Sequence, residues 1–425
     1  MPLNEKKALQ SLTLKAIANA VVIGLMSERW KGKTRFKVLL MIDGWGLVTT
    51  YYSSLITHFF PNNDAAQTFL ARIIIINTVN QLIKIKMPAD NSTILITPQQ
   101  MQERFAFILR HAGFTEERAN ACAEIFTANS VDGIYTHGVN RFPRFVQYVK
   151  DGHVLPQATP TLQHKFGGME QWNGNLGPGP LNAIHATESA MALARQHGIG
   201  CVALGNTNHW MRGGTYGWHA AKAGFVFIGI TNTIGIMPAW GAVDARLGNN
   251  PFVMALPYKD EAIVLDMAMS QYSFGAMELA IFKNEKLAVP GGYNDAGELT
   301  NDPASILASK RPLPIGYWKG AGLSLLLDIL SAILSGGFAG HDITSSGIES
   351  NVSQVFIAID ISKLGNHSVI SKTVEGIIDD YHQSVTAEPS KKITYPGERV
   401  LQNRQTNLAN GIPVLRSVWK VIEGL

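Results

Sequence analysis

Residues 201–230 read CVALGNTNHWMRGGTYGWHAAKAGFVFIGI, and this stretch decides the fold class. The short apolar runs Cys201–Leu204 and Phe225–Ile230 predict two strands. The polar, glycine-rich segment 205–218 between them leads into a short helix that we expect to end near Gly224. Strands and helices mixed in this way predict an α/β enzyme with α+β character.

The same mixture continues on both sides of that stretch. Thr97-Pro98-Gln99-Gln100 predicts a helix start, because Thr is a favoured N-cap, Pro suits the first turn and Gln at the third position completes a capping box. Thr115 predicts the start of a second helix. Further helices are expected at 183–197 and Leu323–Leu334, and further strands at Phe252–Leu256, Ile263–Leu265 and Val355–Ile361.

Residues 1–93 differ from the rest in charge. They hold 11 Lys and Arg against 5 Asp and Glu, whereas the remaining residues hold 25 against 27. The main part of the chain therefore has no net charge that favours nucleic acid. In the extension, the apolar run Ala16–Met26 is too short to span a bilayer, and Arg72–Ile76 has high strand propensity. Three interpretations stay open: a membrane or targeting element, an extra domain, or a mis-assigned start upstream of a true start near Met87.

Several common site motifs are absent from the sequence. Two cysteines, Cys122 and Cys201, are too few for a disulfide framework and lack metal-type spacing, which indicates a reducing compartment. The sequence also lacks a Gly-x-Gly-x-x-Gly turn, a Gly-x-x-x-x-Gly-Lys loop, a Tyr four residues before a Lys, and a His-Glu-x-x-His motif. A Rossmann dinucleotide turn, a P-loop NTPase and a zinc protease are not supported, and no metal site is expected.

The densest group of ionisable residues lies at Tyr135–Arg144. An imidazole gives or takes a proton near neutral pH, and a guanidinium binds a carboxylate with two hydrogen bonds. His137 and Arg141 would share one face of a helix, although Pro143 predicts that any helix ends near Asn140–Phe142. The pair suits a 2-keto acid, and a solvated surface turn is the alternative.

Four further segments are candidates for function. Segment 205–218 follows a strand and either lines a ligand pocket or forms a surface turn. Asp266 ends an apolar strand, where it could orient an imidazole, accept from cofactor hydroxyls or make a structural hydrogen bond. Lys319 lies among glycines beside a helix start, which suits either a pyrophosphate or a solvated loop. The charged turn 396–399 means little alone.

Together these segments resemble the malate/L-lactate dehydrogenase family, whose members lack a Rossmann domain. The resemblance covers residues 94–425, and its residues, in order, are Thr136-His137-Gly138, Asn208-His209, Asp266-Met267, Lys319-Gly320 and Pro396-Gly397-Glu398. The longer runs 237–241 and 316–320 are most similar to members that reduce 2-keto acids derived from sugars. Two features depart from the family: Thr136 stands where members usually carry Ser, and residues 1–93 have no counterpart.

The resemblance implies a fold and an organisation. The fold is a mixed, largely antiparallel sheet flanked by helices, a non-Rossmann NAD-binding fold that works as a homodimer with the active site near the subunit interface. Four parts are expected: the extension (1–93), a helical region packed with the C-terminal helices (94–160), an NAD-binding mixed-sheet domain (161–345), and a C-terminal strand with helices (346–425). We expect a cytoplasmic enzyme with a small-molecule substrate and no nucleic-acid or membrane partner.

The resemblance also implies roles for individual residues. His137 is expected to donate a proton, and Arg141 and His209 are expected on the substrate side. The expected contacts to NAD are Ala262, Ile263, Val264, Leu265, Asp266, Met267, Ala268, Trp318, Lys319, Gly397, Glu398 and Arg399.

The expected reaction is hydride transfer from NADH to the C2 carbonyl of a 2-keto sugar acid, while Arg141 holds the carboxylate. Two alternatives stay open. One is a dehydrogenase of another small 2-hydroxy acid, of the malate, lactate or ureidoglycolate type, and the other is a catalytically silent sugar-acid binding protein.

Overall fold

The computed structural model describes residues 22–30, 33–42, 45–51 and 92–425, which belong to two compact units, Met1–Ala89 and Asp90–Leu425. In the first unit, an antiparallel sheet consists of β1 (Val22–Trp30), β2 (Lys33–Ile42) and β3 (Trp45–Tyr51). The sequence did not predict this sheet. The apolar run Ala16–Met26 ends inside β1, whereas residues 16–21 and Arg72–Ile76 lie outside the described residues.

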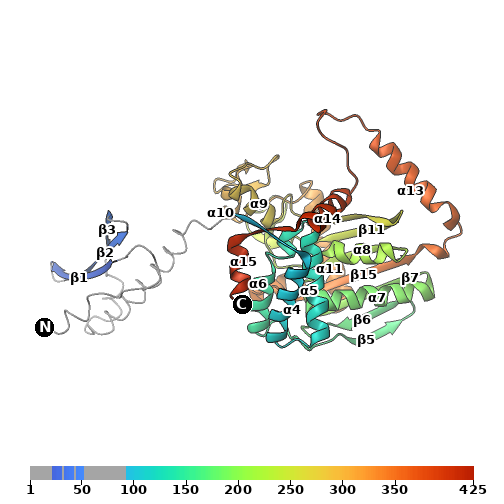
Figure 1. Cartoon of the computed structure of the whole chain (residues 1–425), viewed down its shortest axis with the longest axis horizontal. Helices are drawn as coiled ribbons and strands as arrows, with labels where there is room; N and C mark the ends of the chain where they lie inside the picture. The colour runs from blue at the N-terminus through green and yellow to red at the C-terminus, as the bar shows by residue number, and fades with distance from the viewer. Residues whose placement is uncertain (1–21, 31–32, 43–44, 52–91) are drawn as a thin grey trace. The chain divides into compact units, whose positions relative to one another are not determined.

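A seven-stranded sheet forms the centre of the second unit, in the order β12-β11-β8-β15-β7-β6-β5 (Figure 1). All neighbours run antiparallel except β6 and β7, which confirms the expected mixed, largely antiparallel sheet. The strands are β5 (Thr161–Phe166), β6 (Met169–Asn173), β7 (Ile199–Asn208), β8 (Phe225–Thr231), β11 (Phe252–Tyr258), β12 (Glu261–Met267) and β15 (Ser350–Asp360).

Helices cover both faces of this sheet. Successive residues of each strand point to opposite sides, so apolar side chains lie on both faces and each face is buried under helices. Val202 and Leu204 belong to one buried cluster, under α7 (Gly179–His197) and α8 (Gly213–Lys222). Ala203, between them in β7, belongs to the cluster on the other face, where Leu327 of α11 (Trp318–Ser335) packs. The central strands are therefore apolar at consecutive positions, as buried strands are.

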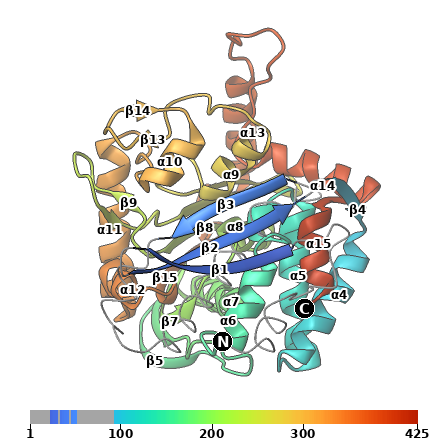
Figure 2. The ribbon, with the colours of Figure 1, turned by 90° about the vertical axis from the view of Figure 1, so that its left-hand side faces the viewer.

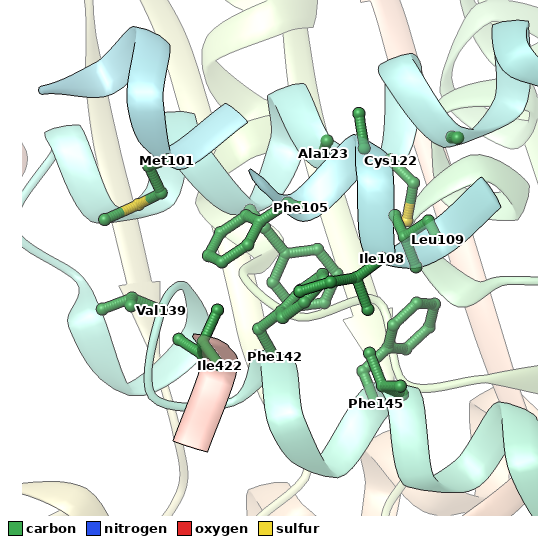
Figure 3. Packing of buried hydrophobic residues seen from close by; sticks show 14 of the residues in the cluster. Met101, Phe105, Ile108, Leu109, Cys122, Ala123, Val139, Phe142, Phe145 and Ile422 are labelled. Atoms are coloured by element: carbon green, nitrogen blue, oxygen red, sulfur yellow. The ribbon is translucent and has the colours of Figure 1, made fainter. Parts of the chain in front are cut away.

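A second core joins the N-terminal helices to the end of the chain. Figure 3 shows aromatic side chains of α4 (Pro98–His111), α5 (Glu116–Val131) and α6 (Phe142–Lys150) packed together, with Ile422 of α15 (Arg416–Glu423) beside them. Figure 2 shows α15 near α4, and the guanidinium of Arg104 in α4 donates to the main-chain carbonyls of Ile422 and Glu423 in α15. β4 (Thr93–Ile96) pairs antiparallel with β16 (Ile412–Leu415), so the two ends of this unit lie together.

The predicted helix starts are confirmed, and one prediction is wrong. Thr97 and Gln100 form the expected capping box, with hydrogen bonds of 3.2 Å and 3.1 Å, and Thr115 caps α5. Pro143 does not end a helix but lies in the first turn of α6. Backbone N–H groups in a first turn have no carbonyl partner within the helix, so the missing N–H of proline costs no hydrogen bond there. The segment before it, Tyr135–His137, is a short 3₁₀ helix named η1.

The other predicted elements fall inside observed ones, with shifted ends. The helix expected at Leu323–Leu334 begins at Trp318, so Lys319 lies in its first turn, and Ile361 leaves β15 to begin η2 (Ile361–Lys363). The remaining elements are β9 (Met237–Pro238), β10 (Ala245–Leu247), α9 (Phe274–Phe282), β13 (Gly292–Tyr293), β14 (Leu299–Thr300), α10 (Pro303–Ser309), α12 (Gly340–Ser346), α13 (His367–His382) and α14 (Glu398–Asn410).

One face of α11 is apolar and exposed. Its exposed apolar side chains, 38% to 64% accessible, are Leu323, Leu325, Leu326, Ile329, Leu330 and Ile333. Among the described residues, α11 is the one helix that is long and apolar enough to cross a membrane by length and composition. Its opposite face is buried: Leu327 packs on the sheet, and the hydroxyl of Ser324 donates to the carbonyl of Gly248 (2.7 Å).

Candidate active site

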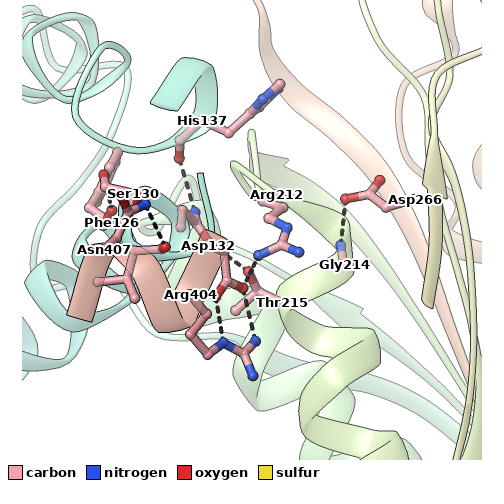
Figure 4. Close-up of polar contacts among 12 residues, drawn as sticks. Phe126, Ser130, Asp132, His137, Arg212, Gly214, Thr215, Asp266, Arg404 and Asn407 are labelled. Carbon is pink, nitrogen blue, oxygen red and sulfur yellow. Dashed lines mark hydrogen bonds and ion pairs between the residues drawn. The ribbon is translucent and has the colours of Figure 1, made fainter. Parts of the chain in front are cut away.

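His137 is held by its main chain at the end of η1. The side-chain amide of Asn129 donates to the carbonyl of His137 (2.9 Å), and Asn129 accepts in turn from the hydroxyl of Thr215 (2.6 Å). These contacts tie α5, η1 and α8 together (Figure 4). Gly138 allows the close approach of η1 to α5, since a Cβ there would lie 2.2 Å from the hydroxyl of Ser130.

Thr136, the residue that departs from the family, contacts both His137 and α9. Its Oγ1 lies 3.1 Å from Nδ1 of His137, so the hydroxyl retains a hydrogen bond to the imidazole. Its methyl group faces Gly275, where an added Cβ would lie only 2.3 Å away. The extra methyl therefore fills space between η1 and α9, in a position that requires glycine opposite it.

Two imidazoles face each other at the centre of the site. The rings of His137 and His209 are nearly parallel (18°), with centroids 5.7 Å apart. Nδ1 of His209 accepts from the backbone N–H of Met211 (2.9 Å), so the neutral ring carries its proton on Nε2. Met211 has a left-handed φ of +68°, a strained backbone conformation of the kind found at binding sites.

Both imidazoles are held in the neutral form. Burial lowers the pKa of His137 to about 4, and the positive charges of Arg141 and Arg212 add to this effect. Burial, followed by the charges of Arg141, His137 and Arg144, lowers the pKa of His209 well below its ordinary value. A bound anion would oppose these guanidiniums and raise both pKa values, which favours an acidic ligand at this site.

Arg212 belongs to an ion-pair network that the sequence did not reveal. Arg212 and Arg404 both pair with Asp132 at the end of α5, and the Nε–Oδ1 distance from Arg404 is 2.7 Å. The side chains of Arg212 and Asp132 are 5% and 7% exposed, so this is a buried contact. It joins α5, the start of α8 and α14 immediately behind His137 (Figure 4). No local pattern indicates it, because its members are far apart in sequence.

Arg141 also has a partner that the sequence did not reveal. Its Nη2 lies 2.8 Å from Oε2 of Glu349, and the two side chains are 23% and 11% exposed. Arg141 borders a small recess, whose other lining residues are Arg144, Phe145, Tyr148, Val154, Asn208, His209 and Met211. The structure thus brings the three predicted site residues, His137, Arg141 and His209, to one place.

Asp266 makes a structural contact rather than one to an imidazole. Its Oδ2 accepts from the backbone N–H of Gly214 (2.8 Å), in the first turn of α8. A carboxylate at a helix N-terminus is favourable because the free N–H groups and the helix dipole are positive there. Asp266 is exposed at the edge of the sheet, but nearby protein atoms partly desolvate its carboxyl group and raise its pKa, while Arg212 and Gly214 act in the opposite direction.

The predicted cofactor contacts lie along β12, an edge strand of the sheet. In the middle of the strand, the N–H of Val264 donates to the carbonyl of Pro396 (3.0 Å), which brings the turn 396–399 against the strand. Just beyond the end of the strand, the N–H of Ile315 donates to the carbonyl of Met269 (2.8 Å), three residues before α11 begins. Two of the predicted segments therefore approach the strand from different parts of the chain.

The residues at this edge fit an anionic, aromatic cofactor. Trp318 is 65% exposed beside Lys319 in the first turn of α11, and Tyr317 before it has a left-handed φ of +61°. An exposed helix N-terminus with a lysine suits phosphate groups. The buried hydroxyl of Ser270, three residues after the end of β12, has no hydrogen-bond partner among the described residues.

The turn 396–399 contributes mainly shape. A Cβ at Gly397, which has a φ of +98°, would lie 3.2 Å from the backbone nitrogen of Val264, so glycine allows the close contact. Oε2 of Glu398 accepts from the backbone N–H of Tyr395 (3.1 Å) and lies 3.2 Å from Nε2 of His382, so this carboxylate already has partners. Arg399 is exposed.

Comparisons with known proteins identify the family of the chain. The sequence model of the malate/L-lactate dehydrogenase family matches residues 96–423. The chain is 41% identical to 2,3-diketo-L-gulonate reductase of Citrobacter koseri and 40% identical to that of Escherichia coli, over 78% of this chain and 99% of each relative.

Solved structures give the same result. The sulfolactate dehydrogenase of Methanocaldococcus jannaschii superposes with a TM-score of 0.72 at 27% identity, over 78% of this chain and 96% of that one. The malate dehydrogenase of Pyrococcus horikoshii gives 0.70 at 28% identity, over 79% and 95%. The chain belongs to the malate/L-lactate dehydrogenase family, whose members are oxidoreductases of 2-hydroxy acids that in general depend on a nicotinamide nucleotide.

Proposed function

We propose that this enzyme reduces 2,3-diketo-L-gulonate to 3-keto-L-gulonate with NADH. The observation that carries the proposal is the meeting of His209 and Arg141 at one recess, with the ring of His137 stacked on that of His209. A small acid bound there would contact a guanidinium and an imidazole together. The names of the relatives at 40–41% identity support the choice of this keto acid over others.

The residues of the chain divide the chemical work. Arg141 binds the substrate carboxylate and so directs the C2 carbonyl toward the imidazoles. A bound NADH supplies the hydride. His137, which takes up a proton once the substrate's negative charge offsets the nearby guanidiniums, donates it to the carbonyl oxygen as the alcohol forms. His209 stays neutral and offers its Nε2–H as a hydrogen-bond donor.

The cofactor would bind along the edge of the sheet formed by β12. The segment 262–268 would contact it by main chain and side chain, Lys319 would meet its phosphates at the start of α11, and Trp318 offers an exposed aromatic ring. The turn 397–399 would contact the cofactor from beside the middle of the strand, with Arg399 as a second positive charge. Asp266, whose Oδ2 is bound to Gly214, would offer its other oxygen to a ribose hydroxyl.

We also propose that the enzyme is a homodimer in the cytoplasm. The exposed apolar face of α11 would be stabilised by burial against another apolar surface. The same face of a second copy of the chain is such a surface. Trp318 and Lys319 lie at the start of this helix, so such an interface would run close to the cofactor. The unpaired thiols Cys122 and Cys201 suit a reducing compartment. The roles of the four parts of the chain remain proposals.

The test is a substrate comparison followed at 340 nm. The purified full-length protein should oxidise NADH with 2,3-diketo-L-gulonate and show at least tenfold lower kcat/KM with pyruvate, oxaloacetate and sulfopyruvate. Preference for one of those three acids would favour the alternative of another 2-hydroxy-acid dehydrogenase, which the malate and sulfolactate dehydrogenase structures support. No oxidation with any of them would favour the silent binding protein.

The native mass addresses the assembly. Sedimentation in buffer without detergent should give a dimer, and replacing Leu326 and Ile333 on α11 with Glu should give monomers. A wild-type monomer would contradict the homodimer. Recovery of the wild type only with detergent would indicate that a membrane covers this face instead.

A further inference from the structure

The ion pair between Arg141 and Glu349 joins two distant parts of the chain. Nη2 of Arg141, at the start of α6, lies 2.8 Å from Oε2 of Glu349, directly before β15. The glutamate is only 11% exposed, although it lies in a connecting segment where charged side chains usually point to solvent. A carboxylate that is withdrawn from water in this way serves a specific partner.

Glu349 is fixed to the same strand pair as His209. Its neighbour Ser350 pairs with Asn208 across β15 and β7, and the hydroxyl of Ser350 donates to the side-chain oxygen of Asn208 (2.8 Å). Asn208 is held in turn, because its amide donates to the carbonyls of Leu176 (2.9 Å) and Gly177 (3.1 Å). The carboxylate of Glu349 and the imidazole of His209 therefore start from adjacent, rigid backbone positions.

Glu349 also balances the charge around the imidazoles. Three guanidiniums act on the two histidines: Arg141 and Arg212 on His137, and Arg141 and Arg144 on His209. Arg212 pairs with Asp132, which it shares with Arg404, whereas Glu349 pairs with Arg141 alone among the described residues. Arg144 donates to the hydroxyl of Tyr148 (2.9 Å) and forms no ion pair among the described residues.

The geometry of the pair leaves Arg141 able to bind a second acid. The contact uses one nitrogen of the guanidinium, and an arginine side chain has five N–H donors in a rigid plane. A carboxylate on one side of that plane fixes its orientation and leaves donors on another side for the substrate. This is the arrangement expected when one acid positions a guanidinium for another.

We propose that Glu349 is a positioning residue of this site, which orients Arg141 for the carboxylate of the 2-keto acid. The inference rests on the proposed function. Loss of Glu349 leaves a half-buried guanidinium without its anchor, and misplacement of a substrate by about 1 Å costs roughly 100-fold in rate. The effect passes through Arg141, so it appears in the handling of the acid and not in the binding of NADH.

Kinetics of the full chain test the inference. Glu349→Ala should lower kcat/KM for the 2-keto acid by roughly 10- to 100-fold and leave KM for NADH unchanged. Glu349→Gln, which keeps an oxygen that accepts from Arg141, should recover part of this loss and guards against misfolding of the alanine variant. The matched control is Glu170→Gln: Glu170 is 8% exposed and pairs with Lys165 at 2.8 Å on β6, and its replacement should leave kcat/KM unchanged.

A double variant shows whether Arg141 carries the effect. Arg141→Ala alone leaves Glu349 as an unpaired carboxylate facing the substrate acid, so adding Glu349→Ala should not reduce kcat/KM further. Losses that multiply would overturn the inference, as would an alanine variant of Glu349 within twofold of wild type.

Binding of oxalate separates this inference from the proposed function. Oxalate, a two-carbon analogue of a 2-keto acid, should bind the NADH-saturated protein in a calorimeter, and Glu349→Ala should raise its Kd at least tenfold. A wild type that binds oxalate in this way but reduces no 2-keto acid would remove the proposed function and keep the role of Glu349. Equal Kd values for wild type and variant, or no oxalate binding by either, would remove that role.

Discussion

The corner around His137 and the edge strand β12 are built in opposite ways. Around His137, the two guanidiniums that lower its pKa both have buried carboxylate partners: Arg212 has Asp132, and Arg141 has Glu349. Along β12 and the start of α11, by contrast, Trp318 and Lys319 are exposed and Ser270 has no hydrogen-bond partner among the described residues. The first region is complete in the single chain, whereas the second offers unused groups.

The difference reflects what each region has to do. Proton transfer and carbonyl orientation require groups fixed in advance, and buried ion pairs with second contacts provide that rigidity. A large cofactor must enter and leave, so the surface that receives it stays open and gains its partners on binding. Substitutions in the first region should therefore damage turnover or folding, and substitutions in the second should damage cofactor affinity alone.

The largest effect is expected at the imidazole. His137→Ala should lower kcat by roughly 100- to 10,000-fold, the range that general acid catalysis contributes. The Kd for NADH, measured by fluorescence titration, should stay the same. His164→Ala, an exposed histidine on β5, is the control and should behave as wild type. Near-normal turnover of His137→Ala would remove this residue from the mechanism.

The next largest effect is on folding. Asp132→Ala leaves Arg212 buried without a partner, and breaking a buried pair in this way costs about 3–5 kcal/mol of unfolding free energy. Denaturant titration should show this loss. Asp244→Ala, which removes an exposed ion pair with Arg246, should leave the transition in place. If both variants have the same unfolding free energy, the ion pairs around His137 do not stabilise the fold as we describe.

A smaller effect is expected at the open edge. Lys319→Ala should raise the Kd for NADH by roughly 10- to 100-fold, the value of one hydrogen bond to a charged group. The melting temperature without cofactor should not change, because the side chain is exposed. Lys363→Ala, at a distant exposed lysine, serves as the control. A change in melting temperature without a change in the Kd for NADH would show that Lys319 stabilises the fold and does not bind the cofactor.

The smallest effect is a displacement of pH profiles. The pKa of His137 is lowered to about 4 in the free enzyme, and reduction needs its protonated form. The kcat/KM for reduction should therefore fall as pH rises above that value, and oxidation of the product should rise. The kcat profile, which reports the bound complex, should show a pKa roughly 1 unit or more higher, since a bound carboxylate offsets Arg141. Coincident profiles would contradict carboxylate binding next to His137.

Local sequence chemistry determined much of this protein. The caps at Thr97 and Thr115 act within one turn, and apolar runs such as Phe225–Ile230 have the length of buried strands, so these elements could be read directly. Motifs in order along the chain indicated the family, the mixed sheet and the segment that holds His137. At Pro143 the sequence wrongly predicted a helix end. Proline disfavours a helical conformation in the residue before it, and this holds both after the end of one helix and at the start of the next.

Only the tertiary structure decided which charges meet. Glu349 and Arg404 lie in unremarkable sequence, and they contact Arg141 and Asp132 because β15 and α14 return to the N-terminal helices. It also decided that Asp266 binds the start of α8 instead of an imidazole. Periodicity and capping depend on neighbours a few residues away, whereas the partner of a buried charge depends on how the whole chain packs.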